Sequence, residues 1–157
     1  MENYMKLEIL AIGENESFAR SAVAAFALPL NPTISELSDI KTAVSEAVTN
    51  CIVHAYPGMR STAKITIECR AKQEKENGLL HIVITDEGCG IDDIEKATAP
   101  FFTTLAEGER SGMGFTIMQT FMDEFGLESE KGKGTRVTMK KRVGFLETNT
   151  QKERINA

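Results

Sequence analysis

The sequence has few cysteines, no long hydrophobic run and no signal-peptide pattern. Its three cysteines, Cys51, Cys69 and Cys89, form no CxxC pair and have no histidine at zinc-ligand spacing, which predicts neither a disulfide framework nor a zinc site. The longest apolar stretch, residues 22–30, contains Pro29 and is shorter than the roughly 20 residues that a membrane-spanning helix needs. The N-terminus has no basic region followed by an apolar one. We therefore expect a cytoplasmic protein that does not act at a membrane.

The chain also lacks a block of basic residues. Its 18 Lys and Arg stand against 23 Asp and Glu, a net charge of −5, so we do not expect a nucleic acid as the direct partner. The 157 residues are 41% apolar and 26% charged, as in an ordinary globular domain. We expect one domain over residues 1–142 and a polar, aperiodic tail over 143–157.

Helix and strand patterns are clear in the first third of the chain. Apolar and polar residues alternate over 5–12, which predicts a half-buried strand. We expect Asn15 to cap a helix over 16–28 that ends at Pro29. Thr33 and Glu36 have the spacing of a capping box, which predicts a long helix from there to about Ala55.

The rest of the chain alternates in a way that predicts two hairpins. Strands are expected over 63–71 and 79–85, and again over 125–130 and 135–141. Between the hairpins we expect a short helix from about residue 92, an irregular segment over 100–114 and a helix over 115–124. Together these elements predict an α/β (α+β) two-layer sandwich, with a mixed, mostly antiparallel sheet and helices on one face.

A polar stripe follows the long predicted helix. Glu46, Asn50 and His54 repeat every fourth residue and therefore share one side of the helix. Ala43 and Ala47 flank Asn50 and leave space beside it. A carboxylate and an amide one turn apart can bind a hydrated Mg²⁺ and orient or deprotonate a nucleophile. Taken alone, the stripe is more often a solvated flank beside an apolar arc, which here comprises Ile40, Val44, Val48, Cys51 and Ala55.

A glycine-rich turn, residues 86–90, follows the strand predicted to end at residue 85. Asp86 begins it, and a carboxylate accepts hydrogen bonds from groups such as the exocyclic amine of adenine. Gly88 and Gly90 let the backbone turn sharply and come close to a flat ring. By itself, a run of this kind is more often only a turn.

Two further glycine-rich runs lie at 112–114 and 132–134. The first leads from Arg110 into a helix, whose N-terminal amides and dipole attract phosphate. It matches neither a Walker motif nor a Rossmann turn, and a plain helix entry is equally compatible with it. The second precedes Thr135 and is, taken alone, the least informative of the motifs.

The order of these motifs resembles the GHKL ATPase and kinase superfamily. Its N box resembles residues 46–54, and its three glycine boxes resemble 86–90, 112–114 and 132–135. Within the superfamily the sequence is most similar to the small anti-sigma-factor serine kinases of sporulating bacilli, through the runs 15–20, 100–104 and 109–118. The resemblance covers about residues 5–141.

The resemblance implies a Bergerat ATP-binding fold, ATP or ADP with Mg²⁺, and two protein partners. One is a sporulation sigma factor held inactive, and the other is an anti-anti-sigma factor phosphorylated on serine. On matching positions, Glu46 is the catalytic base, Asn50 the Mg²⁺ ligand and Asp86 the adenine reader, while Arg110 lies near the terminal phosphate and the docking partner. The expected nucleotide-binding residues are Asn50, His54, Asp86, Gly88, Gly90, Thr103, Thr104, Gly112, Met113, Gly114 and Thr135.

Other functions remain open on the sequence. A non-catalytic ATP-binding module that only sequesters a partner is disfavoured by Glu46 beside Asn50, because a merely bound nucleotide needs no base. The catalytic domain of a sensor histidine kinase would be preceded by a two-helix, histidine-bearing segment, which this sequence lacks.

The partner surface is expected on the first helix. Glu16 and Arg20 are four residues apart, a spacing that by itself indicates an exposed ion pair. Because the resemblance includes this segment, we expect Glu16 and Arg20 to contact a partner. The family also implies a homodimer, with the N-terminal strand and the first helix near the interface.

Overall fold

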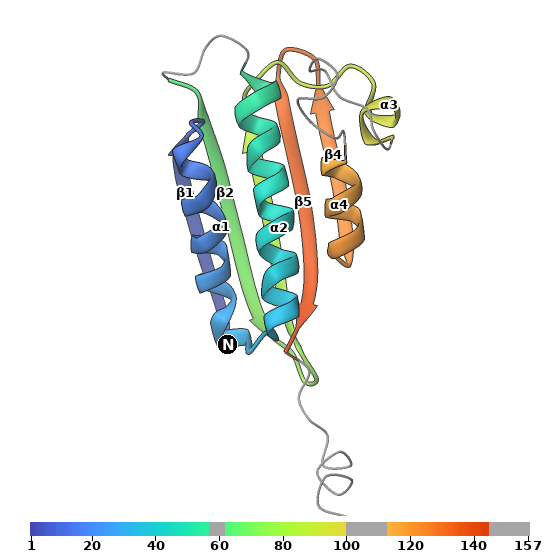
Figure 1. Cartoon of the computed structure of the whole chain (residues 1–157). Helices are drawn as coiled ribbons and strands as arrows, with labels where there is room; N and C mark the ends of the chain where they lie inside the picture. Colours follow the sequence, from blue (N-terminus) through green and yellow to red (C-terminus); the bar gives the residue numbers. More distant parts are fainter. Residues whose placement is uncertain (57–61, 100–112, 145–157) are drawn as a thin grey trace, which may run out of the picture.

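The computed structural model describes residues 1–56, 62–99 and 113–144 and consists of two layers, a sheet and helices on one of its faces (Figure 1). The five strands follow the order β1-β2-β3-β5-β4, and every neighbouring pair is antiparallel. Their bounds are β1 Glu2–Leu10, β2 Lys64–Gln73, β3 Gly78–Asp86, β4 Glu124–Glu130 and β5 Gly134–Val143. Both predicted hairpins and the two-layer α/β architecture are confirmed.

The helices α1, α2 and α4 lie side by side over the sheet (Figure 1). Their bounds, with the short helix α3 and the single 3₁₀ turn η1, are α1 Glu14–Ala27, η1 Leu28–Leu30, α2 Ile34–Asn50, α3 Ile94–Thr98 and α4 Gly114–Phe121. A π-helical turn, η2 Cys51–Ala55, continues α2 directly. No helix among the described residues is long and apolar enough to cross a membrane.

The core lies between the two layers. Alternate residues of β2 and β3 point at the helices and are almost fully buried, as are those of the apolar arc of α2. The largest of them are Ile40, Val44, Val48, Ile65, Ile67, Leu80, Ile82 and Ile84. The predicted arc is thus confirmed as the buried face of α2, and it holds the neighbouring polar stripe in a fixed orientation.

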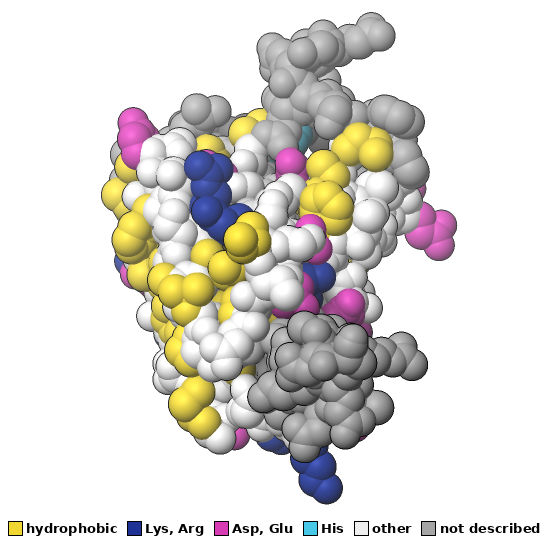
Figure 2. Space-filling view, turned by 60° about the horizontal axis from the view of Figure 1, so that its bottom comes forward, with side chains coloured by type: hydrophobic (Ala, Val, Ile, Leu, Met, Phe, Trp, Pro, Cys, Tyr) yellow, Lys and Arg dark blue, Asp and Glu magenta, His cyan; other side chains and the backbone are white. Residues whose placement is uncertain are grey.

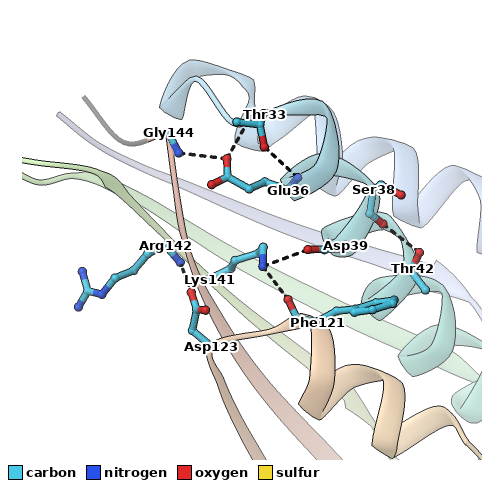
Figure 3. Close-up of polar contacts among 10 residues, drawn as sticks. All are labelled: Thr33, Glu36, Ser38, Asp39, Thr42, Phe121, Asp123, Lys141, Arg142 and Gly144. Atoms are coloured by element: carbon cyan, nitrogen blue, oxygen red, sulfur yellow. Dashed lines mark hydrogen bonds and ion pairs between the residues drawn. The ribbon is translucent and has the colours of Figure 1, made fainter. Parts of the chain in front are cut away.

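The two helix starts that the sequence predicts have different outcomes. The capping box is confirmed, because Thr33 N donates to Glu36 Oε2 at 2.7 Å and Glu36 N donates to Thr33 Oγ1 at 3.1 Å (Figure 3). The cap at Asn15 is wrong: α1 begins at Glu14 and Gly13 occupies its N-cap. The Asn15 side chain donates instead to the carbonyl of Leu10, so it braces the turn after β1.

Two predicted helix ends also differ. The long helix does not stay α-helical to Ala55, because its last five residues widen into the π-turn, a feature that often accompanies functional sites. Helix α4 ends at Phe121 rather than residue 124, since β4 already begins at Glu124. The predicted irregular segment and the tail fall largely on residues 100–112 and 145–157, which lie outside the described residues.

Candidate functional site

A cavity of about 540 Å³, a size typical of small-ligand sites, lies at the C-terminal end of α2. Five parts of the chain surround it: the end of α2 with its π-turn, the end of β3 with the glycine-rich turn after it, α3, the start of α4, and the start of β5. The polar lining residues are Asn50, Cys51, His54, Asp86, Cys89, Asp92, Asp93, Lys96 and Thr135, with Ala47, Ile84, Ile91, Phe115 and Val137 among the apolar ones.

Asp86 is the buried carboxylate of this cavity, with only 5% of its surface exposed. Its Oδ1 accepts from Gly88 N at 2.9 Å, and its Oδ2 accepts from Cys51 Sγ at 3.4 Å. Burial raises the pKa of Asp86 above its ordinary value of 3.8, and the hydrogen bonds to the carboxylate oppose this shift. A carboxylate held in this way keeps free lone pairs for a donor inside the cavity.

Cys51 supports Asp86 from the π-turn. Burial and the neighbouring carboxylate raise the pKa of the Cys51 thiol well above its ordinary value of 9.0. The thiol therefore keeps its proton at neutral pH and donates a hydrogen bond to Asp86. The sequence placed Cys51 only in the apolar arc, since the contact joins residues 35 positions apart.

Thr135 lies opposite Asp86 on the neighbouring strand β5. Its hydroxyl is 2.8 Å from Ser129 Oγ, which accepts from Ile91 N at 2.8 Å and donates to Gly134 O at 2.9 Å. This network joins the glycine-rich turn after β3 to the hairpin of β4 and β5. Asp86 and Thr135 are thus presented together by rigid strands.

Glycine is required where these turns meet. Gly90 has φ +71° and Gly134 has φ +100°, both in the left-handed region that glycine favours. A Cβ on Gly90 would collide with the carbonyl of Glu130, and one on Gly134 with the carbonyl of Asp86. A side chain at either position would therefore push the turn after β3 away from the hairpin turn between β4 and β5.

The polar stripe of α2 meets the start of α4 at the same cavity. A Cβ on Gly114 would lie 3.2 Å from both Glu46 Oε2 and Asn50 Nδ2, so the N-terminus of α4 approaches the stripe as closely as a glycine permits. Asn50 and His54 line the cavity, and half-buried Glu46 lies beside Gly114. The carboxylate and the amide therefore share one wall with the first turn of a helix.

The structure brings together most of the described candidate residues. Those that line the cavity are Asn50, His54, Asp86, Gly90, Gly114 and Thr135. Gly88 instead packs its backbone against the carbonyl of Ala55, and neither it nor Met113 lines the described part of the cavity. Thr103, Thr104, Arg110 and Gly112 lie outside the described residues. Lys96 and Phe115 also line the cavity, and neither was among the site residues predicted from the sequence.

Comparison with known proteins agrees with this geometry. The family model of the histidine kinase-like ATPase domain matches residues 14–141. The chain is 56% identical to the anti-sigma F factor of Caldanaerobacter subterraneus, over 90% of this chain and 95% of that protein. It is 50% identical to the anti-sigma F factor of Clostridium acetobutylicum, over 94% and 99% of the two chains. The chain belongs to the anti-sigma F factor family. The expected superfamily is confirmed with it.

Solved structures of other proteins share the fold of this chain. The RsbU and RsbW domains of Rv1364c from Mycobacterium tuberculosis match with a TM-score of 0.62 and 16% identity, over 92% of this chain and 35% of that one. The mycobacterial sensor histidine kinase MprB matches with a TM-score of 0.51 and 17% identity, over 92% and 100%. At these identities the matches support the fold alone.

Thiol chemistry offers a test of the cavity in this member of the anti-sigma F factor family. Cys89 is exposed and lines the cavity, whereas Cys51 and Cys69 are buried, and burial raises the pKa of Cys69 to about 12 and that of Cys51 well above 9.0. We expect iodoacetamide to modify Cys89 first, and Mg-ATP to slow that reaction about tenfold by covering the thiol. Mass spectrometry of timed samples measures both rates. Unchanged labelling of Cys89 at saturating Mg-ATP would contradict a nucleotide in this cavity.

Proposed function

We propose that this protein is an anti-sigma factor and a protein-serine kinase: it binds and inhibits a sporulation sigma factor, and it phosphorylates an anti-anti-sigma factor with ATP. The observation that carries the proposal is that one cavity is lined by a buried acceptor, Asp86, and by Asn50 and Gly114, with Glu46 beside Gly114. One end suits an adenine and the other suits phosphates. Relatives named anti-sigma F factors, at 48–56% identity, support the partner assignment.

The adenine end depends on Asp86 and Thr135. Asp86 accepts a hydrogen bond from an exocyclic amine, and its contacts with Gly88 N and Cys51 Sγ fix the orientation of the carboxylate. Ile84, Val137 and Ala55 supply an apolar lining on which a flat ring can rest. A guanine would present an oxygen at the position of the amine and leave Asp86 facing another acceptor, so the site favours adenine.

The phosphate end depends on Asn50, Glu46 and the start of α4. Mg²⁺ is usually held by one or two protein oxygens together with phosphates and water, so the Asn50 amide oxygen is a suitable ligand although no cluster of three acidic or histidine ligands occurs among the described residues. The first amides of α4 point at incoming phosphate oxygens. Bound Mg-ATP supplies the phosphoryl group. Glu46 orients or deprotonates the attacking serine hydroxyl.

Four candidates outside the described residues complete the proposed site. Thr103, Thr104 and Gly112 are proposed to line the nucleotide, and Arg110 to contact the terminal phosphate and the docking partner. A planar guanidinium forms strong charge-assisted hydrogen bonds to phosphate, which suits that role.

Incubation with the partner tests the kinase activity. The purified protein, Mg-ATP and the anti-anti-sigma factor of the same organism are mixed, and the partner is analysed by tandem mass spectrometry. We expect one phosphoserine whose formation depends on Mg²⁺. A partner that stays unmodified while the protein binds both ATP and the sigma factor would instead indicate a non-catalytic sequestering module.

The proposed partner surface lies on the outer side of α1 and α2. Arg20 Nη1 is 3.2 Å from Glu16 Oε1 and 3.4 Å from Ser45 Oγ, and Ser45 also donates to Glu16. The Arg20 side chain is still 39% exposed. It stands at one end of a groove whose other lining residues include Ala24, Leu28, Ile34, Leu37 and Lys41. A fixed, half-exposed cation beside an apolar groove suits an acidic and apolar partner segment.

Charge reversal at Arg20 tests this surface. We expect Arg20→Glu to weaken sigma-factor binding about a hundredfold, because it removes a cation and places a like charge beside Glu16. ATP binding is expected to stay unchanged, since Arg20 does not line the nucleotide cavity. Surface plasmon resonance gives the sigma-factor affinity. The matched control for net charge is Lys133→Glu, an exposed lysine that pairs with Glu130 and does not line the groove. Equal losses in both variants would dismiss a specific role for Arg20.

We further propose a homodimer formed through the side of the molecule that contains β1 and α1. Strand β1 is an edge strand, and exposed Tyr4, Leu10 and Phe18 lie on β1 and α1. Figure 2 shows hydrophobic side chains gathered on this side of the molecule. An apolar surface beside an unpaired strand edge favours association of two copies.

A further inference from the structure

Lys141 is a buried cation on the face of β5 that carries the buried apolar side chains of this strand. It is only 8% exposed, and the described residues include one other buried charged residue, Asp86. On β5 it faces the helices between Met139 and Val143, which are both fully buried. Methionine would pack at this position without the cost of burying a charge. The lysine therefore must serve an interaction that an apolar residue cannot make.

The Lys141 ammonium group joins two helices. Its Nζ donates to the carbonyl of Phe121 at 2.7 Å and lies 3.4 Å from Asp39 Oδ2 (Figure 3). Phe121 is the last residue of α4, where carbonyls lack a partner within the helix and favour a nearby cation. Asp39 belongs to α2. Lys141 thus fastens the C-terminal end of α4 to α2.

The other end of α4 lies at the nucleotide cavity. Gly114, its first residue, packs against Glu46 and Asn50, so α4 runs antiparallel along α2 from that stripe back to Asp39. A helix of eight residues is about 12 Å long, and its backbone hydrogen bonds connect one end to the other. A shift at its C-terminal end therefore displaces its N-terminal amides as well.

We propose that Lys141 is a positioning residue for phosphate binding: by fixing the end of α4 on α2, it determines where the N-terminal amides of α4 stand beside Asn50 and Glu46. The inference rests on the proposed function, because it assumes that the cavity binds ATP. It concerns the phosphate end only. Asp86 and Thr135 lie on β3 and β5, whose pairing does not depend on α4.

Nucleotide affinities of the variant Lys141→Met test this role. The substitution keeps the length and apolar stem of the side chain and removes only the ammonium group. We expect the Kd for Mg-ATP to rise about tenfold and the Kd for AMP to change by less than about twofold, because AMP depends mainly on the adenine end. Isothermal titration measures ATP, and competition with a fluorescent adenine nucleotide measures AMP.

Lys140→Met is the matched control. Lys140 is the adjacent residue on the opposite face of β5, where its Nζ pairs with Glu124 at 2.8 Å. We expect this variant to bind ATP and AMP as the wild type does. If Lys141 served stability alone, Lys141→Met would melt at a lower temperature than the wild type but would change the affinities for ATP and AMP by the same factor. That result would overturn the proposal.

A second variant keeps the test valid if Lys141→Met does not fold. Asp39→Asn removes the charge from one partner of Lys141 and leaves its bond to the Phe121 carbonyl. We expect a weaker change of the same kind, about threefold for ATP and none for AMP. Unchanged ATP binding in both variants would also overturn the role of Lys141. Absence of ATP binding by the wild type would refute the proposed function itself.

Discussion

Asp86→Asn is expected to weaken ATP binding about a hundredfold without destabilising the nucleotide-free protein. The carboxylate is the buried acceptor of the cavity, and a hydrogen bond to a charged group contributes about 1.5–3 kcal/mol. An asparagine has nearly the same shape but carries a donor amide in place of one acceptor oxygen. The one oxygen of the asparagine would accept from Gly88 N. Its side-chain NH₂ group would then face the adenine amine, so that two donors would meet.

The stability of the wild type relative to Asp86→Asn should depend on pH in a defined direction, because only the wild type has a carboxyl group at this position. Burial raises the pKa of folded Asp86 above 3.8, so the folded protein holds this proton more tightly than the unfolded chain. The contribution of the protonated Asp86 carboxyl to the free energy of unfolding is complete below pH 3.8. It is lost as the pH rises through the raised pKa of the folded protein. At pH 7 we therefore expect Asp86→Asn to melt at or above the wild-type temperature.

Calorimetry with ATP and thermal melting at several pH values measure both effects. Asp123→Asn is the matched control, since Asp123 does not line the cavity. Its Oδ2 accepts a hydrogen bond from Arg142 N at 2.6 Å (Figure 3). We expect that control to bind ATP normally. Wild-type ATP affinity in Asp86→Asn would mean that the adenine lies elsewhere.

Glu46→Gln is expected to lower kcat for phosphorylation of the anti-anti-sigma factor about a thousandfold, because a positioned general base contributes about 10²–10⁴. Glutamine keeps the size of the side chain and its place beside Gly114 but cannot take a proton. ATP affinity should change little, since the proposed contact of Glu46 is with the serine hydroxyl of the partner and not with the nucleotide.

Single-turnover phosphorylation, quenched and followed by mass spectrometry, gives the rate. Glu124→Gln, a substitution of the same kind in an exposed ion pair on β4, is the control and should leave the rate unchanged. An undiminished rate in Glu46→Gln would require another group to orient the serine hydroxyl. An equal loss of ATP affinity would instead indicate a role in nucleotide binding.

Local patterns were sufficient to predict most of the fold. The Thr33 capping box, the polar stripe of α2 and both hairpins follow from spacings within a few residues, and tertiary packing agrees with them. The cap at Asn15 failed because Gly13 and Glu14 could already begin the helix, and the carbonyl of Leu10 attracted the asparagine side chain. Helix periodicity likewise gave no sign of the π-turn, since that pattern assumes α geometry throughout.

Contacts between distant segments were beyond such patterns. The thiol of Cys51 reaches Asp86, and Lys141 reaches Asp39, over separations that no spacing rule covers. The sequence predicted a strand that includes position 141, but it could not predict which polar groups would meet a lysine there. Lys96 lines the cavity for the same reason, because the packing of α3 against α4 depends on the whole fold.

The central claim is that one cavity binds ATP and presents its phosphates to Glu46 and Asn50. Hydrogen exchange of the backbone amides, measured by mass spectrometry with and without Mg-ATP, tests it most directly. We expect slowed exchange in residues 50–56, 86–93 and 113–116 and at the start of β5, with no change in the groove between α1 and α2. Slowed exchange confined to that groove, or exchange unaltered by saturating Mg-ATP, would contradict the claim.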